Sequence, residues 1–390
     1  MIFLWATIFV LSILIFVHEL GHFMAARSVG VHVERFSIGF PPRFISMTSI
    51  IDGWDIKIYF FKSNDGKLVW GPIYKKQIKY MGRIGSGTEY VLALIPLGGY
   101  VKMAGMIDES MDTKISHAPD EFMSKSAWEK IWVLSAGVIM NIITAFIIFS
   151  CLSYVQGDAE ILDEPIVSEL RDGMPAQEAG VLSGDRIIAI DGFQINTWKE
   201  LTNVIHKIPN KPILLTIERD KNIFDISITT TSMVVPNSNK KMDTLGVIGI
   251  VPQIIYSDML WSDALNSGVV ATVNSVGMIV MSFNMLFTGV ASVSDLGGPI
   301  MIAQLAGETA NEGWIPLFSF MALISVNLAF LNILPIPGLD GGHIFIILIE
   351  SIIRRPLTIK ARMVIQQVGM TFLLLLMVTV VFNDITRLFN

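Results

Sequence analysis

The chain has 390 residues, of which 52% are apolar and 16% are charged, and its mean hydropathy is +0.59. Soluble domains carry about 25% charged residues, so this composition indicates a membrane protein. The net charge of −6 provides no basic surface for nucleic acid, and the single cysteine excludes an intrachain disulfide and zinc sites of the Cys₄ or Cys₂His₂ kind.

The first apolar segment, residues 1–26, is long enough to cross about 30 Å of hydrocarbon as a helix. It lacks the basic start and the small-residue cleavage site of a signal peptide. The first Lys or Arg of the chain is Arg27, and basic residues accumulate after it. By the positive-inside rule, we expect the N-terminus outside and residues 27–130 in the cytoplasm.

Three later segments are also apolar enough to be transmembrane helices. They are residues 131–155, 315–340 and 363–383. Polar residues with strand and turn signals occupy 156–258, which we therefore expect on the extracytoplasmic side. The predicted fold class is an α-helical polytopic membrane protein with a four-span core.

Residues 264–290 are weakly apolar and either cross the membrane or lie at its interface. Their many polar side chains favour the interface, so we assign 255–312 to interfacial amphipathic helices and a connecting loop. Four spans return the basic loop from Arg354 to Arg362 to the inside. A fifth span would place this loop outside, against the positive-inside rule.

The motif His18-Glu19-Leu20-Gly21-His22 lies near the inner end of the first expected helix. Because residues i and i+4 share a helix face, both imidazoles can bind one Zn²⁺. Glu19 lies beside them and can take a proton from zinc-bound water, whose pKa the metal lowers towards 7. Ionisable residues inside a membrane are usually functional, which favours a metal site over a chance match.

A catalytic zinc needs three protein ligands and one open position. Asp340 is the best candidate for the third ligand, because the topology places it at the inner end of a later span, at the depth of His18 and His22. Neighbouring prolines and glycines open the backbone there, which is tolerated around a polar cavity. His343 and Glu350 are rivals, and a solvated aspartate at a helix end is the alternative.

HELGH in a first span, followed by Asn332-Ile-Leu-Pro-Ile-Pro-Gly-Leu-Asp340-Gly-Gly after a later one, resembles the site-2 protease family, in particular its bacterial RseP-type branch. The resemblance covers almost the whole chain. It implies an intramembrane zinc metalloprotease in which His18, His22 and Asp340 bind the metal and Glu19 is the general base.

The resemblance also implies a set of substrate-binding residues. They are Asn327, Asn332, Pro335, Pro337, Gly98 and Gly99. The two amides could hold an extended peptide backbone, with an interhelical hydrogen bond as the alternative.

Residues 94–103 resemble the re-entrant β-hairpin of the family, whose edge strand could pair with an unwound substrate. An ordinary cytoplasmic hairpin is the alternative. Residues 45–87 look longer than the family minimum and have no assigned role, and Val138 stands where the family usually has proline.

Residues 160–235 resemble a bacterial PDZ domain, because turn signals such as Ser-Gly-Asp185 bound short apolar runs, and a helix-like segment begins at Trp198. The branch commonly has two such domains, and only one is evident in this sequence. PDZ grooves bind peptides by strand addition. This domain could therefore bind a substrate tail, exclude bulky ectodomains, or serve only for packing.

We therefore expect a multi-pass zinc endopeptidase of the bacterial inner membrane, with its PDZ-like domain on the periplasmic side. Its expected partners are membrane lipid, single-span substrates such as anti-sigma factors or signal-peptide remnants, and a peptide ligand of the PDZ-like domain. A non-catalytic PDZ scaffold and a zinc or cation transporter are the alternatives. A scaffold predicts missing ligands, and a transporter predicts several intramembrane acidic residues; neither pattern is evident.

Overall fold

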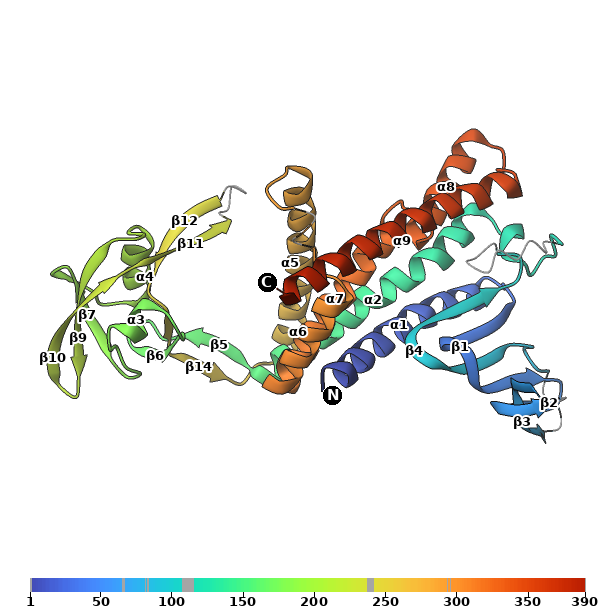
Figure 1. Ribbon diagram of the computed structural model, residues 1–390, viewed down its shortest axis with the longest axis horizontal. Helices are drawn as coiled ribbons and strands as arrows, with labels where there is room; N and C mark the ends of the chain where they lie inside the picture. The colour runs from blue at the N-terminus through green and yellow to red at the C-terminus, as the bar shows by residue number, and fades with distance from the viewer. Residues whose placement is uncertain are drawn as a thin grey trace. The chain divides into compact units, whose positions relative to one another are not determined.

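The computed structural model describes residues 2–64, 67–80, 82, 84–106, 116–236, 242–292, 294 and 296–389 (Figure 1). The chain divides into two compact units. The helical unit comprises Met1–Leu152 and Ser262–Asn390, and the inserted unit comprises Ser153–Trp261. Each unit has a core of its own.

The helical unit is built mainly from long apolar helices. They are α1 (Ile2–Ser28), α2 (Ala127–Gln156), α5 (Trp261–Phe287), α6 (Pro299–Glu312), α7 (Trp314–Ile333), α8 (Asp340–Ile353) and α9 (Ile359–Phe389). Of the described helices, five are long and apolar enough to cross a membrane, namely α1, α2, α5, α7 and α9. The chain is therefore a multi-pass membrane protein. The helix beyond the four expected spans is α5, which we expected to lie at the membrane interface. Its length and composition also allow it to cross the membrane.

The third expected span ends earlier than residue 340, because α7 stops at Ile333. Pro335 and Pro337 explain the difference. Proline has no N–H for the helical ladder, and it disfavours helical backbone in the residue before it, which fits the extended conformation of Leu334. Gly338 then adopts a φ of +100°, and Asp340 is the first residue of a separate helix, α8.

Helices α1, α2 and α7 pack together in defined directions. His22 contacts Val133, and His18 contacts Asn141, so α2 runs antiparallel to α1. On another side of α1, Leu14 shares a buried cluster with Met321 of α7, and Asn332 reaches His18. From the first of these contacts to the second, the residue number increases in both helices, so α7 runs parallel to α1.

A four-stranded sheet in the order β3-β2-β1-β4 completes the helical unit. Its strands are β1 (Val33–Ile50), β2 (Gly53–Asn64), β3 (Lys67–Lys79) and β4 (Glu89–Met103). Arg35 pairs with both Lys102 and Glu89, and Ile38 pairs with both Gly99 and Leu92, so the start of β1 lies between the two halves of β4. A buried cluster that includes Val33, Phe36 and Val101 joins the sheet to α1 and α2.

This sheet corrects the expected hairpin in residues 94–103. That segment is the second half of β4 and pairs with β1, so its partner strand comes from a distant part of the sequence. The unassigned stretch 45–87 supplies the end of β1 and all of β2 and β3.

The inserted unit contains a sheet in the order β10-β9-β7-β8. Its strands are β7 (Arg186–Ile190), β8 (Phe193–Gln194), β9 (Pro212–Arg219) and β10 (Asn222–Thr229). Three two-stranded pairs accompany it: β5 (Asp158–Ile161) with β14 (Ile254–Ser257), β6 (Val167–Leu170) with β13 (Ile250–Pro252), and β11 (Thr231–Pro236) with β12 (Met242–Val247). Helix α4 (Trp198–His206) begins at Thr197, whose hydroxyl accepts the N–H of Glu200, and α3 (Pro175–Glu178) is a single turn.

The core of the inserted unit contains Ile187, Leu215 and Ile217, which have no exposed surface. Each buried side chain of this size contributes about 1.5–3 kcal/mol to stability. The same core includes Ile248, and β13 pairs with β6. The compact inserted unit therefore extends past residue 235, where the PDZ-like segment was expected to end, because the strand partner of β6 comes later in the chain.

Candidate active site

Two histidines of α1 lie side by side in the middle of the helical unit. His18 and His22 are both buried, and their Nε2 atoms are 3.1 Å apart. The helical spacing of four residues places them on one face of α1. Such a pair offers two nitrogen ligands to one metal ion.

Glycine allows α2 to approach this pair closely. A β-carbon on Gly137 would lie 2.5 Å from His22 Nε2 and 2.6 Å from His18 Cε1. On the facing helix, a β-carbon on Gly21 would lie 2.5 Å from the carbonyl oxygen of Ala136. Small residues at a helix crossing let backbones come together within a membrane, and here they hold both imidazoles against α2.

Asp340 reaches the two histidines from the start of α8. Its Oδ2 lies 3.1 Å from His18 Nε2 and 3.3 Å from His22 Nε2. Asp340 is in this position because Pro335 and Pro337 end α7 and a new helix, α8, begins at Asp340. If α7 continued without a break, Asp340 would lie in the middle of a helix. Among the described residues, His18, His22 and Asp340 form a group of side chains that could hold a metal ion.

The three atoms fit a zinc ion. Ligands about 2.0–2.2 Å from a tetrahedral zinc are about 3.3 Å apart, close to the separations of 3.1, 3.1 and 3.3 Å in this site. His22 Nδ1 donates to the carbonyl oxygen of Val133 at 2.8 Å, so in the neutral imidazole Nε2 carries the lone pair that can bind a metal. Asp340 Oδ2 is buried without a hydrogen-bond partner among the described residues. Several lone pairs thus converge where a cation would satisfy them.

Asn141 of α2 provides a comparable support for His18. Its Nδ2 lies 3.3 Å from His18 Nδ1, and its Oδ1 is buried without a partner in the described part of the chain. If the carboxamide is turned by 180°, its oxygen accepts the Nδ1–H of His18. His18 Nε2 is left free to bind a metal. Asn141 was not among the predicted site residues, since α2 is far from the HELGH motif in sequence.

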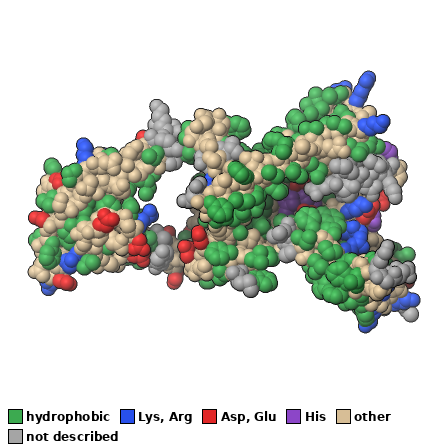
Figure 2. All heavy atoms as spheres, viewed as in Figure 1, with side chains coloured by type: hydrophobic (Ala, Val, Ile, Leu, Met, Phe, Trp, Pro, Cys, Tyr) green, Lys and Arg blue, Asp and Glu red, His purple; other side chains and the backbone are tan. Residues whose placement is uncertain are grey.

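A cavity of about 540 Å³ surrounds these residues. Glu19, Asn332 and Asp340 are among its lining residues, together with both histidines. Figure 2 shows histidine side chains within a hollow of the helical unit. The volume is in the range of small-molecule and peptide pockets, so the site has room for a substrate segment next to Glu19.

Strand β4 forms one wall of this cavity. A β-carbon on Gly99 would lie 3.3 Å from Glu19 Cγ and 2.8 Å from the carbonyl oxygen of Ser37. Residues Gly99–Met103 line the cavity, whereas Gly98 lies under the ring of Phe40. Glycine at position 99 therefore lets the strand approach the carboxylate of α1 without a side chain between them.

Arg35 of β1 also lines the cavity and carries a fixed positive charge. Burial opposes that charge, but hydrogen bonds to Tyr100 and Glu89 raise the pKa of Arg35 above its usual value. Its Nε lies 2.7 Å from Glu89 Oε2. The charge is largely neutralised by this carboxylate, so Arg35 holds β1 and β4 together.

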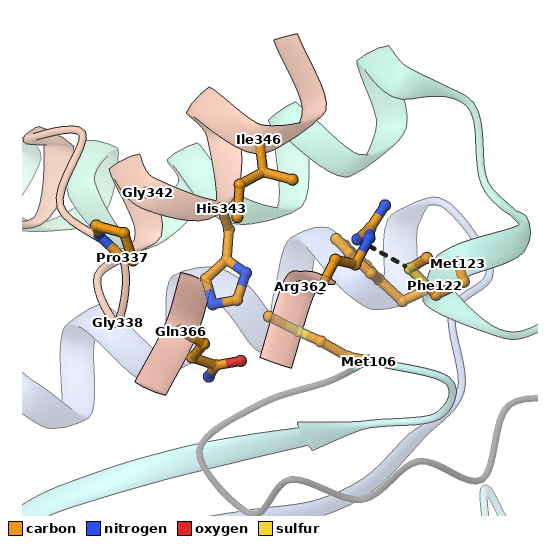
Figure 3. A pocket seen from close by; sticks show the side chains of 10 residues that line it. All are labelled: Met106, Phe122, Met123, Pro337, Gly338, Gly342, His343, Ile346, Arg362 and Gln366. Atoms are coloured by element: carbon orange, nitrogen blue, oxygen red, sulfur yellow. Dashed lines mark hydrogen bonds between the residues drawn. The ribbon is translucent and has the colours of Figure 1, made fainter. Parts of the chain in front are cut away.

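Other expected site residues are placed less centrally. Asn332 Nδ2 lies 3.3 Å from His18 Nε2, at the edge of the metal site. Pro337 lines a smaller adjoining cavity of about 20 Å³, in which His343 of α8 points towards Gln366 of α9 (Figure 3). Asn327 and Pro335 line neither of these two cavities between the described residues.

The rivals for the third ligand position lie elsewhere. Glu350 pairs with Arg362, with 2.5 Å between Oε2 and a guanidinium nitrogen. His343 lines both cavities, yet it is not in the ligand group that the described residues form. The geometry therefore favours Asp340.

The model of a known family, described as Peptidase family M50, matches residues 6–69 and 75–376. The chain belongs to peptidase family M50. This membership confirms the predicted resemblance to site-2 proteases, and it confirms that the chain is a zinc metalloprotease. It also removes the scaffold and transporter alternatives.

Relatives in this family match along nearly their whole length. The zinc metalloprotease RasP of Bacillus licheniformis is 28% identical over 98% of this chain and 99% of the relative. The regulator of sigma-W protease RasP of Bacillus subtilis is 28% identical over 98% of each chain. A protein of Helicobacter pylori assigned as a zinc metalloprotease is 32% identical over 98% of each chain.

Among solved structures, the PDZ domain of the SdrC-like protein of Listeria monocytogenes is similar to part of this chain. It is 20% identical, covers 24% of this chain and 90% of the solved domain, and has a TM-score of 0.19.

Proposed function

We propose that this chain is an intramembrane zinc endopeptidase that cleaves single-span proteins within or near their transmembrane segments. In this proposal His18, His22 and Asp340 bind the zinc ion, and Glu19 is the general base. The convergence of two imidazole nitrogens and one carboxylate oxygen within 3.3 Å carries the proposal.

The chemistry follows from the position of Glu19 in the cavity. Zinc, when bound, supplies a Lewis acid that lowers the pKa of water towards 7 and polarises a peptide carbonyl. Glu19 lies between the two histidines in sequence and lines the same cavity, so its carboxylate takes the proton from the attacking water. It then gives this proton to the leaving amine.

Two features support binding of an extended substrate. Strand β4 lies at the edge of its sheet, and its residues Gly99–Met103 line the cavity. An unwound substrate segment can add to this edge as a strand, so that its freed backbone groups are satisfied beside Glu19. Asn332 lies next to the metal site, where its amide can hold a substrate carbonyl.

The helix directions support the topology in this proposal. Because α7 runs parallel to α1 and α2 runs antiparallel, α2 ends on the same side on which α7 begins. The chain between them therefore makes an even number of crossings or none. We place α5 and α6 as a pair that makes no net crossing, with the N-terminus and the inserted unit on the extracytoplasmic side of the bacterial inner membrane.

The inserted unit has the strands and helix expected of a PDZ-like domain. We assign it to binding a peptide tail of the substrate or to excluding proteins with large ectodomains. Regulated proteolysis of anti-sigma factors and removal of signal-peptide remnants are the substrate classes proposed, and the sigma-W function named for the Bacillus subtilis relative favours the first.

A Glu19→Gln variant tests this proposal. We expect the purified variant to hold the same amount of zinc as the wild type and to lose cleavage of a single-span reporter, because only the general base has changed. Undiminished cleavage would refute the mechanism. Mass spectrometry of membrane proteins that accumulate in cells with this variant would then identify natural substrates.

A further inference from the structure

The hairpin formed by β2 and β3 exposes a cluster of large apolar side chains near its tip. The exposed fractions are 54% for Phe60, 56% for Phe61, 76% for Leu68 and 44% for Val69. The rings of Phe61 and Trp70 are 5.0 Å apart, so the cluster is continuous across the two strands. Exposed apolar side chains that gather in one place usually mark a contact surface.

The same hairpin is strongly basic. There are two lysines in β2 and four in β3. The acidic residues of the hairpin sequence are Asp55 in β2 and Asp65 between the two strands. Asp55 is paired with Lys57 at 2.7 Å. The side chain of Lys62, near the tip, runs back across Gly71, where a β-carbon would lie 2.7 Å from Lys62 Cε. A lysine beside an apolar tip that reaches back in this way is typical of a membrane interface.

The strand registers define the direction in which the tip points. Strand β1 leaves the end of α1 and reaches Ile38, which pairs with Gly99 beside Glu19. The chain then turns, and the second half of β1 returns to Thr48, which pairs with Glu89. Strand β2 reverses once more, since Ile58 pairs with Ile45.

Beyond Ile58, the hairpin continues in the direction that leads back towards the active site. Trp70 Nε1 donates to the carbonyl oxygen of Arg43 at 2.8 Å, which fixes this level of the hairpin next to the turn of β1. The tip therefore points from the end of α1 back along that helix, into the depth that the membrane occupies. Figure 2 shows hydrophobic side chains over much of this sheet, with Lys and Arg at its outer margin.

We propose that the β2–β3 hairpin inserts the apolar side chains of Phe60, Phe61, Leu68 and Val69 into the membrane leaflet nearest the end of α1, while its lysines bind anionic lipid headgroups. Lysines on an edge strand can also serve only to prevent strand pairing. Protection of that kind does not explain four exposed apolar side chains at the tip. Charge and direction together identify lipid as the partner, in a chain that already crosses the bilayer.

A fluorescent label at the tip tests this proposal in the full chain. Cys151→Ser removes the cysteine of the natural sequence, Leu68→Cys places an environment-sensitive dye at the tip, and the protein is reconstituted in nanodiscs of phosphatidylcholine with phosphatidylglycerol. We expect doxyl-lipids to quench the dye, and we expect quenching by iodide in the water to be several-fold weaker than for Asn222→Cys. Residue 222 is the exposed first residue of β10, next to the β9–β10 turn of the inserted unit, which makes it a matched hairpin control. Equal iodide quenching at both positions would overturn the proposal.

The role of the lysines is tested by reversing charge at the base of β3. In Lys75→Glu/Lys76→Glu/Lys79→Glu, each lysine lost near an anionic surface shifts the insertion equilibrium about fivefold or more towards water. We expect the dye at position 68 to become accessible to iodide, while zinc content stays unchanged and shows that the helical unit is folded. Equal shielding in phosphatidylcholine alone would overturn the role of the anionic headgroups. The readouts of this test are dye quenching and zinc content, and neither requires proteolytic activity. The test can therefore fail or succeed independently of the proposed function.

Discussion

Gly137 of α2 lies directly against His22 of α1, and a β-carbon at position 137 would be only 2.5 Å from His22 Nε2. The absence of a side chain at this position is therefore needed for the arrangement of the proposed metal ligands. It lets α2 reach both imidazoles, and it brings Asn141 of the same helix to His18.

We expect Gly137→Ala to reduce zinc binding and reporter cleavage together, because the new methyl group overlaps both imidazoles. Alanine favours a helix over glycine by about 1 kcal/mol, so loss of the helix cannot explain such a result. Gly277→Ala in α5 is the matched control, since nothing lies within 4 Å of the added β-carbon. Measured zinc content close to that of the wild type in Gly137→Ala would contradict the described geometry.

Asn141→Leu is expected to weaken zinc binding by roughly 10- to 100-fold, which is the usual cost of losing a group that orients a metal ligand. Asn141→Asp keeps an oxygen that can accept the Nδ1–H of His18, so it should retain more of the affinity. Competition with a chelator of known affinity measures the difference. Identical midpoints for Asn141→Leu and the wild type would show that this contact does not orient His18.

The identity of the third ligand can be tested by comparing three variants. Asp340→Ala should lose bound zinc, because one of the three converging atoms is removed. His343→Ala and Glu350→Gln should keep it, since Glu350 is paired with Arg362 and His343 lies outside the ligand group. Elemental analysis of purified protein gives the answer directly. Zinc lost from His343→Ala but kept in Asp340→Ala would reverse the assignment.

In the inserted unit, Asp185→Ala is expected to destabilise the sheet by about 2 kcal/mol, because it removes charge-assisted hydrogen bonds from a buried carboxylate. Asp185 is 1% exposed and accepts hydrogen bonds from Arg219 and from the N–H of Leu182. Amide exchange of Ile187 and Ile217 in the full chain should accelerate about 30-fold. The matched control is Glu164→Gln, which disrupts the exposed 3.8 Å pair with Arg186 and should change little.

The spanning helices and the shared helix face of the two histidines could be predicted, because each depends only on neighbouring residues in the sequence. A run of apolar residues predicts a spanning helix, and the spacing of His18 and His22 places both on one face. Pro335 and Pro337 predict that the backbone opens before Asp340, since both act on the neighbouring backbone. The end of α7 at Ile333 agrees with that prediction, although the segment assigned to the third span ran on to residue 340.

The sheet and the surroundings of the site depended on contacts between distant residues. Arg35 pairs with both Glu89 and Lys102, which lie at least 54 residues away in the sequence. Hydrophobic periodicity describes one segment at a time, so it does not predict this pairing. The contact of Asn141 with His18 likewise depends on how α2 packs, and helix spacing within either segment does not contain that information. The sequence signal that could have suggested it is the glycine at 137, four residues before Asn141 on the same helix face.

The order of the ligands along the chain has a consequence for biosynthesis. His18 and His22 are among the first residues made, whereas Asp340 follows only after the inserted unit and α7. In the proposed zinc site, a nascent chain therefore has two of the three ligands until α8 has been synthesised and has packed against α1. The proposed site is complete only after nearly the whole chain has been made.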